Sequence, residues 1–219
     1  MNNYEIQMCQ WEQRMQSLSP SELLKKIPSL KLEGDQLQLL HFGRLIALDL
    51  PTGRLRCLSD SNILSMDLKL NIYTFLWYCK EGATLSGEFL SFHGIKDVSP
   101  FGPAFQRTVL ELLAATFEGK PELLKQAVLS LGGKQINEHS FVLQAFSTLP
   151  VGINFWDGDD EFPAQANILF DENSCDFIHP ESLVTIAIEA MHRLAEQVDL
   201  PVVKLHYNIQ KKEYTYDIP

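Results

Sequence analysis

The sequence has few cysteines, and none of them are grouped. Cys9, Cys57, Cys79 and Cys175 lie far apart, and no two of them form a Cys-x-x-Cys pair. A zinc or iron–sulfur site built from neighbouring cysteines is therefore not supported. The first five residues lack the basic and apolar regions of a secretory signal. We expect reduced thiols and a cytoplasmic location.

Long apolar runs and the common catalytic fingerprints are also missing. No apolar stretch reaches the roughly 18 residues that a membrane-spanning helix needs. The patterns H-x-x-x-H, H-E-x-x-H, G-x-S-x-G and G-x-G-x-x-G do not occur, and neither does a P-loop. The sequence therefore gives no motif evidence for a metalloprotease, a serine hydrolase or a nucleotide-binding site. It also identifies no cofactor.

Basic residues are absent from one long segment. Between Gln135 and His192 there is no Lys or Arg, yet ten acidic residues occur there. The whole chain has 18 basic and 28 acidic residues, a net charge of −10, so this segment accounts for all of the excess. Such a field repels phosphate backbones and anionic lipids, and we expect neither nucleic acid nor membrane as a partner. A cation, a small ligand or a basic protein partner is favoured, and solubility alone is the other explanation.

The order of predicted elements indicates an α+β fold. Strands occur in runs and helices occur in runs, which favours an antiparallel sheet covered by helices, with an N-terminal helical extension. The expected helices cover residues 4–18, a short segment after a capping box at Ser19 and Glu22, and residues 61–80, 103–118, 121–131 and 180–197. The expected strands cover residues 36–42, 44–50, 54–58, 141–149, 151–156 and the return strand 164–170.

Three segments follow from this pattern. We expect an N-terminal helical extension at residues 1–28, a single α+β domain at 29–200, and a tail or edge strand at 201–219. The helix over residues 61–80 is expected to be buried and to begin at a cap provided by Asp60 or Ser61.

The most informative motif is an acidic turn at residues 156–163. It reads Trp156-Asp157-Gly158-Asp159-Asp160-Glu161-Phe162-Pro163. Four carboxylates this close repel one another unless they are solvated, cap backbone N–H groups, bind a cation or share a proton. Asp157-Gly158 is a favoured hairpin pair, because glycine adopts positive φ without cost. The turn is thus a solvated hairpin tip, a metal site formed by Asp157, Asp159, Asp160 and Glu161, or an acid–base pair.

Two further residues are candidates for a site. His93 lies in an aromatic, glycine-containing loop, where binding residues are often found, although single loop histidines are commonly surface residues. Arg107 opens a predicted helix and either bridges to the acidic turn, binds an anionic ligand group or lies on the surface with a packed stem. His179 is expected to cap the last helix, and His192 to lie on a solvated stripe with Thr185, Glu189 and Glu196.

The acidic turn also resembles a known family. Residues 154–163, followed by Ala166-Asn167-Ile168-Leu169-Phe170-Asp171, resemble a bacterial and archaeal family termed domain of unknown function 3786. The segments 43–58, 72–78, 86–92, 104–107 and 131–133 are similar to the family's pattern in the same order, so the resemblance spans residues 40–195. The chain departs from the family at Phe89, where Trp is usual, and at His93-Gly94, where Arg-Glu follows the phenylalanine.

The resemblance implies kinship more than chemistry. Members occur in anaerobes, and some are fused to a four-cysteine iron–sulfur domain similar to one in corrinoid proteins. This context implies an accessory role near corrinoid or iron–sulfur enzymes of one-carbon metabolism.

Three hypotheses follow from the sequence. The first is a non-enzymatic binding or accessory module that uses the four acidic residues with Trp156 and Phe162. The second is an enzyme that combines the acidic turn with Arg107 and His93. The third is that the turn is purely a folding element.

Overall fold

Two antiparallel meanders share one sheet. The computed structural model describes residues 3–208 and 213–217, and within these the main sheet has nine strands. Its order is β4-β3-β2-β7-β8-β9-β5, with β1 paired to β2 and β6 paired to β7. The strands are β1 (Lys31–Glu33), β2 (Gln36–His41), β3 (Arg44–Asp49), β4 (Arg54–Cys57), β5 (Phe89–Ser91), β6 (Lys134–Asn137), β7 (Ser140–Phe146), β8 (Leu149–Trp156) and β9 (Gln165–Asp171).

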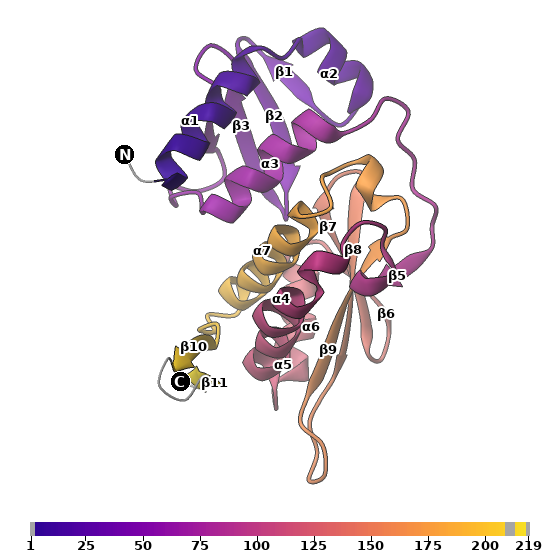
Figure 1. The fold of residues 1–219 in the computed structure, drawn as a ribbon. Coiled ribbons are helices and arrows are strands. Elements are labelled where there is room, and N and C mark those ends of the chain that lie inside the picture. The colour runs from indigo at the N-terminus through magenta and orange to yellow at the C-terminus, as the bar shows by residue number, and fades with distance from the viewer. Residues whose placement is uncertain (1–2, 209–212, 218–219) are drawn as a thin grey trace.

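Helices cover this sheet. The longer ones are α1 (Asn3–Gln16), α2 (Pro20–Lys26), α3 (Met66–Tyr78), α5 (Glu111–Phe117), α6 (Pro121–Ser130) and α7 (Ser182–Gln197). The short ones are η1 (Phe92–Gly94), η2 (Ser99–Phe101), α4 (Gly102–Phe105), the π-helix η3 (Gln106–Leu110) and η4 (Ser174–Asp176). In Figure 1, α1 and α3 lie over β2 and β3, whereas α4–α7 lie over β7–β9. The α+β prediction is confirmed.

The two meanders meet at a narrow joint. β2 pairs with β7 at a single residue pair, His41 with Phe146. Phe146 stacks on Phe75 of α3 with ring centroids 4.0 Å apart, so a helix packs directly against the joint. α3 and α7 pack against each other across the two meanders. Helix packing therefore adds to the few sheet hydrogen bonds at this position.

The N-terminal helices pack onto the first meander. Trp11 of α1 stacks on Tyr73 of α3 with centroids 6.0 Å apart. Gly53, at positive φ, lies so close to α1 that an added Cβ would come within 2.0 Å of the Glu12 carbonyl oxygen. α1 therefore belongs to the packed structure, while the proposed boundaries at residues 28 and 200 stay predictions.

The two predicted helix starts had different outcomes. The N-cap of α3 is Ser65, whose hydroxyl accepts a hydrogen bond from Leu68 N at 3.0 Å, so the prediction of Asp60 or Ser61 was wrong. Ser19 is the N-cap of α2 as predicted, but its hydroxyl pairs with that of Ser21 and accepts from no backbone N–H of the helix, so the capping box does not form. Suitable residue types thus occur at both starts, but the backbone position decides which hydroxyl reaches a helical N–H.

The last helix differs from its predicted polar stripe. Its apolar positions are buried as expected. His179 accepts a hydrogen bond from Glu181 N in the turn before the helix, but the N-cap is Glu181, which makes no side-chain cap hydrogen bond, so His179 does not cap the helix itself. Glu189, however, is only 5% exposed, because it lies against Ser65 and Arg44. Thr185 is also partly buried and donates to Asn71 at 2.6 Å. This side of α7 packs on α3 and β3, so the prediction of a solvated stripe was wrong for Thr185 and Glu189. His192 and Glu196, nearer the end of the helix, are exposed as predicted.

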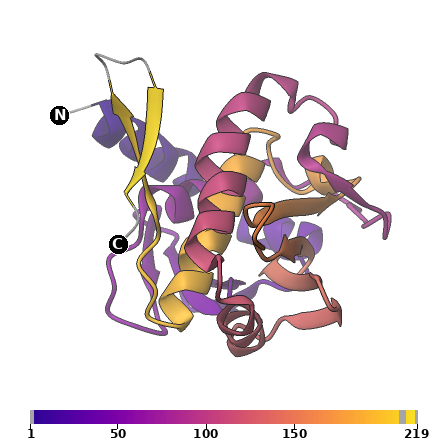
Figure 2. The same ribbon diagram turned by 90° about the horizontal axis from the view of Figure 1, so that it is seen from below.

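The C-terminal segment forms its own small sheet. β10 (Lys204–Asn208) pairs antiparallel with β11 (Glu213–Asp217), and neither strand joins the main sheet. Figure 2 shows this hairpin with α5 and α7 between it and β9. Of the predicted tail or edge strand, residues 209–212 and 218–219 lie outside the described residues. Within the described part of the chain, no helix combines the length and apolar character that crossing a bilayer requires.

Candidate functional site

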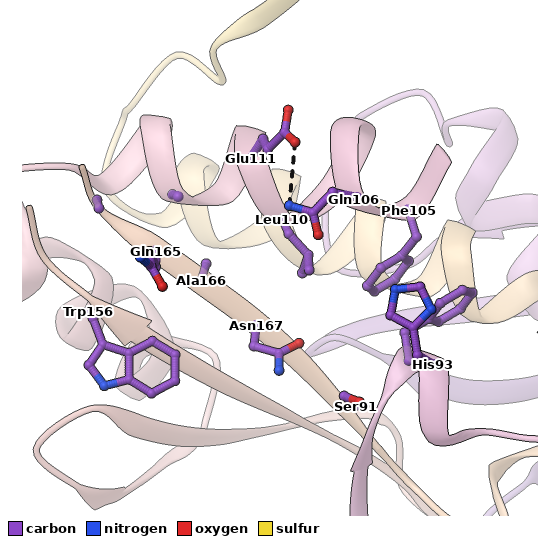
Figure 3. Close-up of a pocket in the computed structure, with 13 residues that line it drawn as sticks. Ser91, His93, Phe105, Gln106, Leu110, Glu111, Trp156, Gln165, Ala166 and Asn167 are labelled. Atoms are coloured by element: carbon purple, nitrogen blue, oxygen red, sulfur yellow. Dashed lines mark hydrogen bonds between the residues drawn. The ribbon is translucent and has the colours of Figure 1, made fainter. Parts of the chain in front are cut away.

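A cavity of about 430 Å³ lies between the helical segment η3–α5 and strand β9 (Figure 3). This volume is within the range of ordinary small-ligand pockets. The polar side chains that line it are Ser91, His93, Gln106, Glu111, Gln165 and Asn167. The aromatic residues of the lining are Phe92, Phe105 and Trp156, of which Trp156 is 42% exposed and the two phenylalanines are buried. The lining thus combines three carboxamides, a carboxylate, a hydroxyl and an imidazole with apolar side chains.

The cavity lies where β5 ends. β5 pairs with β9 only from Leu169 to Asp171, whereas β8 pairs with β9 from Gln165 to Phe170. After Ser91 the chain turns away into η1, which carries His93. The beginning of β9 therefore borders the cavity instead of another strand of the described chain.

A π-helix shapes the helical wall. The predicted continuous helix over residues 103–118 is divided into α4, the π-helix η3 and α5. Gln106 Nε2 donates to Glu111 Oε1 at 3.4 Å, a pair separated by five residues that one π-turn brings together (Figure 3). Short π-helical turns within α-helices occur frequently at functional sites. Both residues are among those that line the cavity.

Stacked rings form the closed end of the cavity. Phe92 and Phe105 stack with centroids 3.9 Å apart and an interplanar angle of 4°. His93 lies next to them against Gly102, where an added Cβ would come within 2.7 Å of His93 Cε1. Glycine at position 102 therefore allows the imidazole to lie flat against the start of α4.

The acidic turn joins the cavity's two walls. Asp157 Oδ1 accepts from Gly119 N at 2.7 Å and from Gly158 N at 3.0 Å. From the other side, Glu118 Oε1 accepts from Ala164 N at 3.1 Å. Glu118 and Gly119 immediately follow α5, so these bonds hold the end of that helix against the β8–β9 hairpin.

Asp159 organises the tip of the same hairpin. Its Oδ1 accepts from Glu161 N at 2.8 Å and from Phe162 N at 2.7 Å, and its own N–H donates to Phe162 O at 2.8 Å. These backbone hydrogen bonds lower the pKa of the Asp159 carboxyl below its usual value. Two of the four carboxylates of the turn, Asp157 and Asp159, thus accept hydrogen bonds from backbone N–H groups.

Gly158 is required for a reason other than the predicted one. Its φ is not positive, so the expected left-handed hairpin pair was wrong. Instead, an added Cβ would come within 2.8 Å of Glu118 Oε1 and 3.0 Å of Ala164 N. Glycine is needed because two chain segments approach closely here.

The structure brings together only some of the predicted site residues. Trp156 and His93 line the same cavity. Arg107 lies on η3 beside Gln106 but is not among the lining residues. Asp160, Glu161 and Phe162 lie at the exposed hairpin tip, and Phe162 is 62% exposed. Within residues 3–208 and 213–217, no group of three or more His, Cys, Asp and Glu side chains is arranged to hold a metal ion.

Sequence reasoning missed most of the cavity's polar groups. Gln106 and Glu111 are ordinary helix residues, and only the π-turn makes them neighbours. Gln165 and Asn167 alternate along β9 on the face that also carries Trp156 across the ladder. That period-two pattern was the one available signal for them.

The family resemblance predicted from the sequence is confirmed. The profile of a family described as Domain of unknown function (DUF3786) matches residues 20–193. The matched region includes every residue that lines the cavity. The comparisons with curated proteins and with solved structures gave no match.

Proposed function

The chain belongs to the DUF3786 family, and from that premise we propose that it is a non-enzymatic binding module whose site is the cavity beside β9. The observation that carries the proposal is the convergence of three carboxamides on one partly aromatic cavity. Gln106 comes from the π-turn, and Gln165 and Asn167 come from β9.

The chemistry of the lining indicates the kind of ligand. Carboxamides both donate and accept hydrogen bonds, so they suit ligands with amide, hydroxyl or heterocyclic groups. Glu111 is the one carboxylate among the lining residues, and no Lys or Arg is among them. A neutral or cationic ligand is therefore favoured over an anionic one. Trp156 is 42% exposed and offers a ring surface for an apolar or cationic group.

In this proposal the acidic turn supports the site. Asp157 and Glu118 join the hairpin to the end of α5, so they fix the distance between the cavity's two walls. Asp160 and Glu161 remain exposed and add negative potential near the entrance. This assignment combines the binding hypothesis with the folding-element hypothesis.

The proposal is tested by binding at the cavity's own atoms. We would titrate ¹⁵N-labelled protein with a set of small amides, nucleosides, sugars and polyamines. The indole N–H of Trp156, identified with a Trp156→Phe variant, and the side-chain amides of Gln165 and Asn167 are the reporters. A ligand of the proposed class shifts these signals together.

The matched variants are Asn167→Leu, which removes one lining amide, and Gln144→Leu, which removes an exposed amide of β7 outside the lining. We expect Asn167→Leu to weaken binding about tenfold, equivalent to about 1.4 kcal/mol, and Gln144→Leu to leave it unchanged. Ligands that bind both variants equally well, or a set in which nothing shifts the reporters, would contradict the proposal.

The finer hypotheses from the sequence stay predictions. The enzymatic alternative needs the carboxylates of the acidic turn, Arg107 and His93 together, and of these groups His93 alone lines the cavity. The cation site, the cytoplasmic location and the accessory role near corrinoid or iron–sulfur enzymes have no structural observation that favours them.

A further inference from the structure

We propose that the natural occupant of the cavity is an extended segment of a partner protein, which adds to the free edge of β9 as a strand and carries a basic side chain. This inference rests on the proposed binding function and specifies the ligand. Strand addition supplies affinity through backbone hydrogen bonds, while pockets beside the edge select side chains.

The first argument is the direction of the backbone groups of β9. Glu172 N donates to Glu88 O at 2.9 Å, so the backbone of residue 172 faces the β5 side. β8 and β9 pair without a register shift, and backbone direction alternates along a strand. Phe170, Ile168 and Ala166 therefore face the same side as Glu172. Phe170 lies opposite Leu90 of β5, but Ile168 and Ala166 lie beyond the point where β5 ends.

The second argument is the position of the cavity relative to the strand. Four consecutive residues, 164 to 167, line it. Successive side chains of a strand point to opposite faces of the sheet, so a cavity on one face would contact only alternate residues. Contact with consecutive residues places this cavity along the strand's outer edge. The backbone N–H and C=O groups of Ala166 and Ile168 thus face the cavity.

The third argument is the geometry of the available space. An added segment would continue the line of β5 from Ser91 along residues 165–168, a length of about 14 Å. The wall formed by η3 and α5 lies on one side of this line, and the Trp156 ring lies on the other. Unpaired strand edges of this kind are normally covered or protected. In this chain, the described residues leave it beside a cavity.

Charge complementarity identifies the partner's chemistry. The segment from Gln135 to His192, which includes β9 and the acidic turn, contains ten acidic residues and no Lys or Arg. Glu111 lines the cavity, and Glu118, Asp157 and Asp159 lie at the hairpin end. A peptide that carries Lys or Arg is attracted to this end, whereas an acidic segment is repelled.

The test begins with a surface-displayed library of random heptapeptides, selected against the full chain. Selected peptides are synthesised and measured by isothermal calorimetry, together with versions that carry a single N-methyl group at each position in turn. Strand addition predicts an alternating pattern, in which methylation weakens binding more than about tenfold at every second residue and leaves the others nearly unchanged.

The protein side of the test uses Ala166→Pro with Ala166→Val as its control. Proline removes the backbone N–H of residue 166, which faces the cavity, but keeps the backbone hydrogen bonds of Gln165 and Asn167 to β8. Edge strands tolerate proline at a position whose N–H faces away from the sheet. Valine adds bulk but keeps the N–H. We expect about a tenfold loss for proline and a smaller change for valine. The N-methyl series on the unmodified chain decides the question even if the proline variant fails to fold.

Each outcome is decisive. Selected peptides with a basic residue, an alternating methylation pattern and sensitivity to Ala166→Pro support the inference. No selected peptide, or binding that is indifferent to backbone methylation, overturns it. If small ligands still shift the Trp156 signal in the latter case, the cavity remains a binding site and strand addition alone is rejected. If neither peptides nor small ligands bind, both proposals fall.

Discussion

At the residue scale, Asp171 is the most consequential side chain outside the cavity. It is fully buried, and its carboxylate accepts hydrogen bonds from the N–H groups of Ser86, Gly87 and Asn173 and from the Ser86 hydroxyl. These bonds hold the loop before β5 against the end of β9. Ser91 and His93 follow that loop directly, so Asp171 positions one border of the cavity.

Replacing this carboxylate tests its role through pH. Burial alone would raise the pKa of Asp171, but the hydrogen bonds from Ser86, Asn173 and Gly87 outweigh it and lower the pKa below its usual value. Because the folded-state pKa is depressed, the stabilisation is present above the unfolded pKa near 4 and is lost as pH falls through the folded value. We expect Asp171→Asn to cost about 2–4 kcal/mol at pH 7 and up to about 1 kcal/mol less at pH 3, where part of the charge-dependent stabilisation has been lost.

Urea unfolding at both pH values measures this difference. Asp35→Asn, in the exposed turn before β2, serves as the matched control and is expected to change little. If Asp171→Asn lowers the free energy of unfolding equally at pH 7 and pH 3, the charge of the Asp171 carboxylate does not account for its contribution to stability.

Residue identity alone predicted part of the site. Trp156 and His93 were recognised because an exposed aromatic beside acidic residues and a histidine in a loop are visible in the sequence. Gly158 was recognised for the wrong reason, since the space beside it is limited by the backbone N of Ala164 and by the side chain of Glu118, forty residues earlier in the chain. Contacts between distant segments leave no local signature, and the hydrogen bonds of Asp157 and Asp171 were hidden for the same reason.

At the element scale, the start of α3 shows how a cap contributes to packing. The Ser65 hydroxyl accepts from Leu68 N and donates to Glu189 Oε2 at 3.1 Å, so one side chain serves α3 and α7 together. Burial raises the pKa of Glu189, and the Ser65 hydrogen bond and the cations Arg44 and Arg193 oppose that shift.

Removing this hydroxyl is expected to destabilise the protein. We expect Ser65→Ala to lower the free energy of unfolding by about 1–2 kcal/mol, from the lost cap and the lost donor to Glu189. Ser61→Ala, at a position that sequence reasoning considered for the cap, should change stability by less than about 0.5 kcal/mol. Thermal and urea unfolding of the two variants measure the contrast, and equal effects would contradict this role of Ser65.

Element prediction worked best where periodicity was strong. The alternating segments became β2, β3, β7, β8 and β9, and the amphipathic segment became α7. The π-helix η3 was not predicted, because one residue of extra winding changes no propensity and barely changes the pattern of apolar residues. The part of the site that depends on it, the pair Gln106 and Glu111, could not be recognised from the sequence.

At the scale of the whole molecule, a buried polar chain joins the two meanders. The Thr185 hydroxyl of α7 donates to Oδ1 of Asn71 on α3, and Nδ2 of Asn71 lies 3.4 Å from Nε2 of His41 on β2. The Nδ1 of His41 lies 2.8 Å from the carbonyl oxygen of Ala145 on β7. These hydrogen-bonded polar groups thus link the helices α3 and α7 with the strands β2 and β7, at the joint where β2 and β7 share a single residue pair. Buried polar groups connected in this way favour one arrangement of the packed elements over others.

His41 should therefore control the acid stability of the whole fold. Burial, helped by the charges of Arg193 and Arg44, lowers its pKa to about 3, although the bond to Ala145 opposes that shift. Below about pH 6.5 the unfolded chain binds a proton that the folded chain excludes, so stability falls as pH decreases toward the folded value. The fall is about 1.4 kcal/mol per pH unit, or about 2–3 kcal/mol between pH 6.5 and 4.5. We expect His41→Gln to abolish this dependence of stability on pH and His139→Gln, at an exposed site, to keep it. Urea unfolding of both variants between about pH 6.5 and 4.5 measures the difference. If His41→Gln loses stability with falling pH as steeply as the unmodified protein, other groups control acid stability.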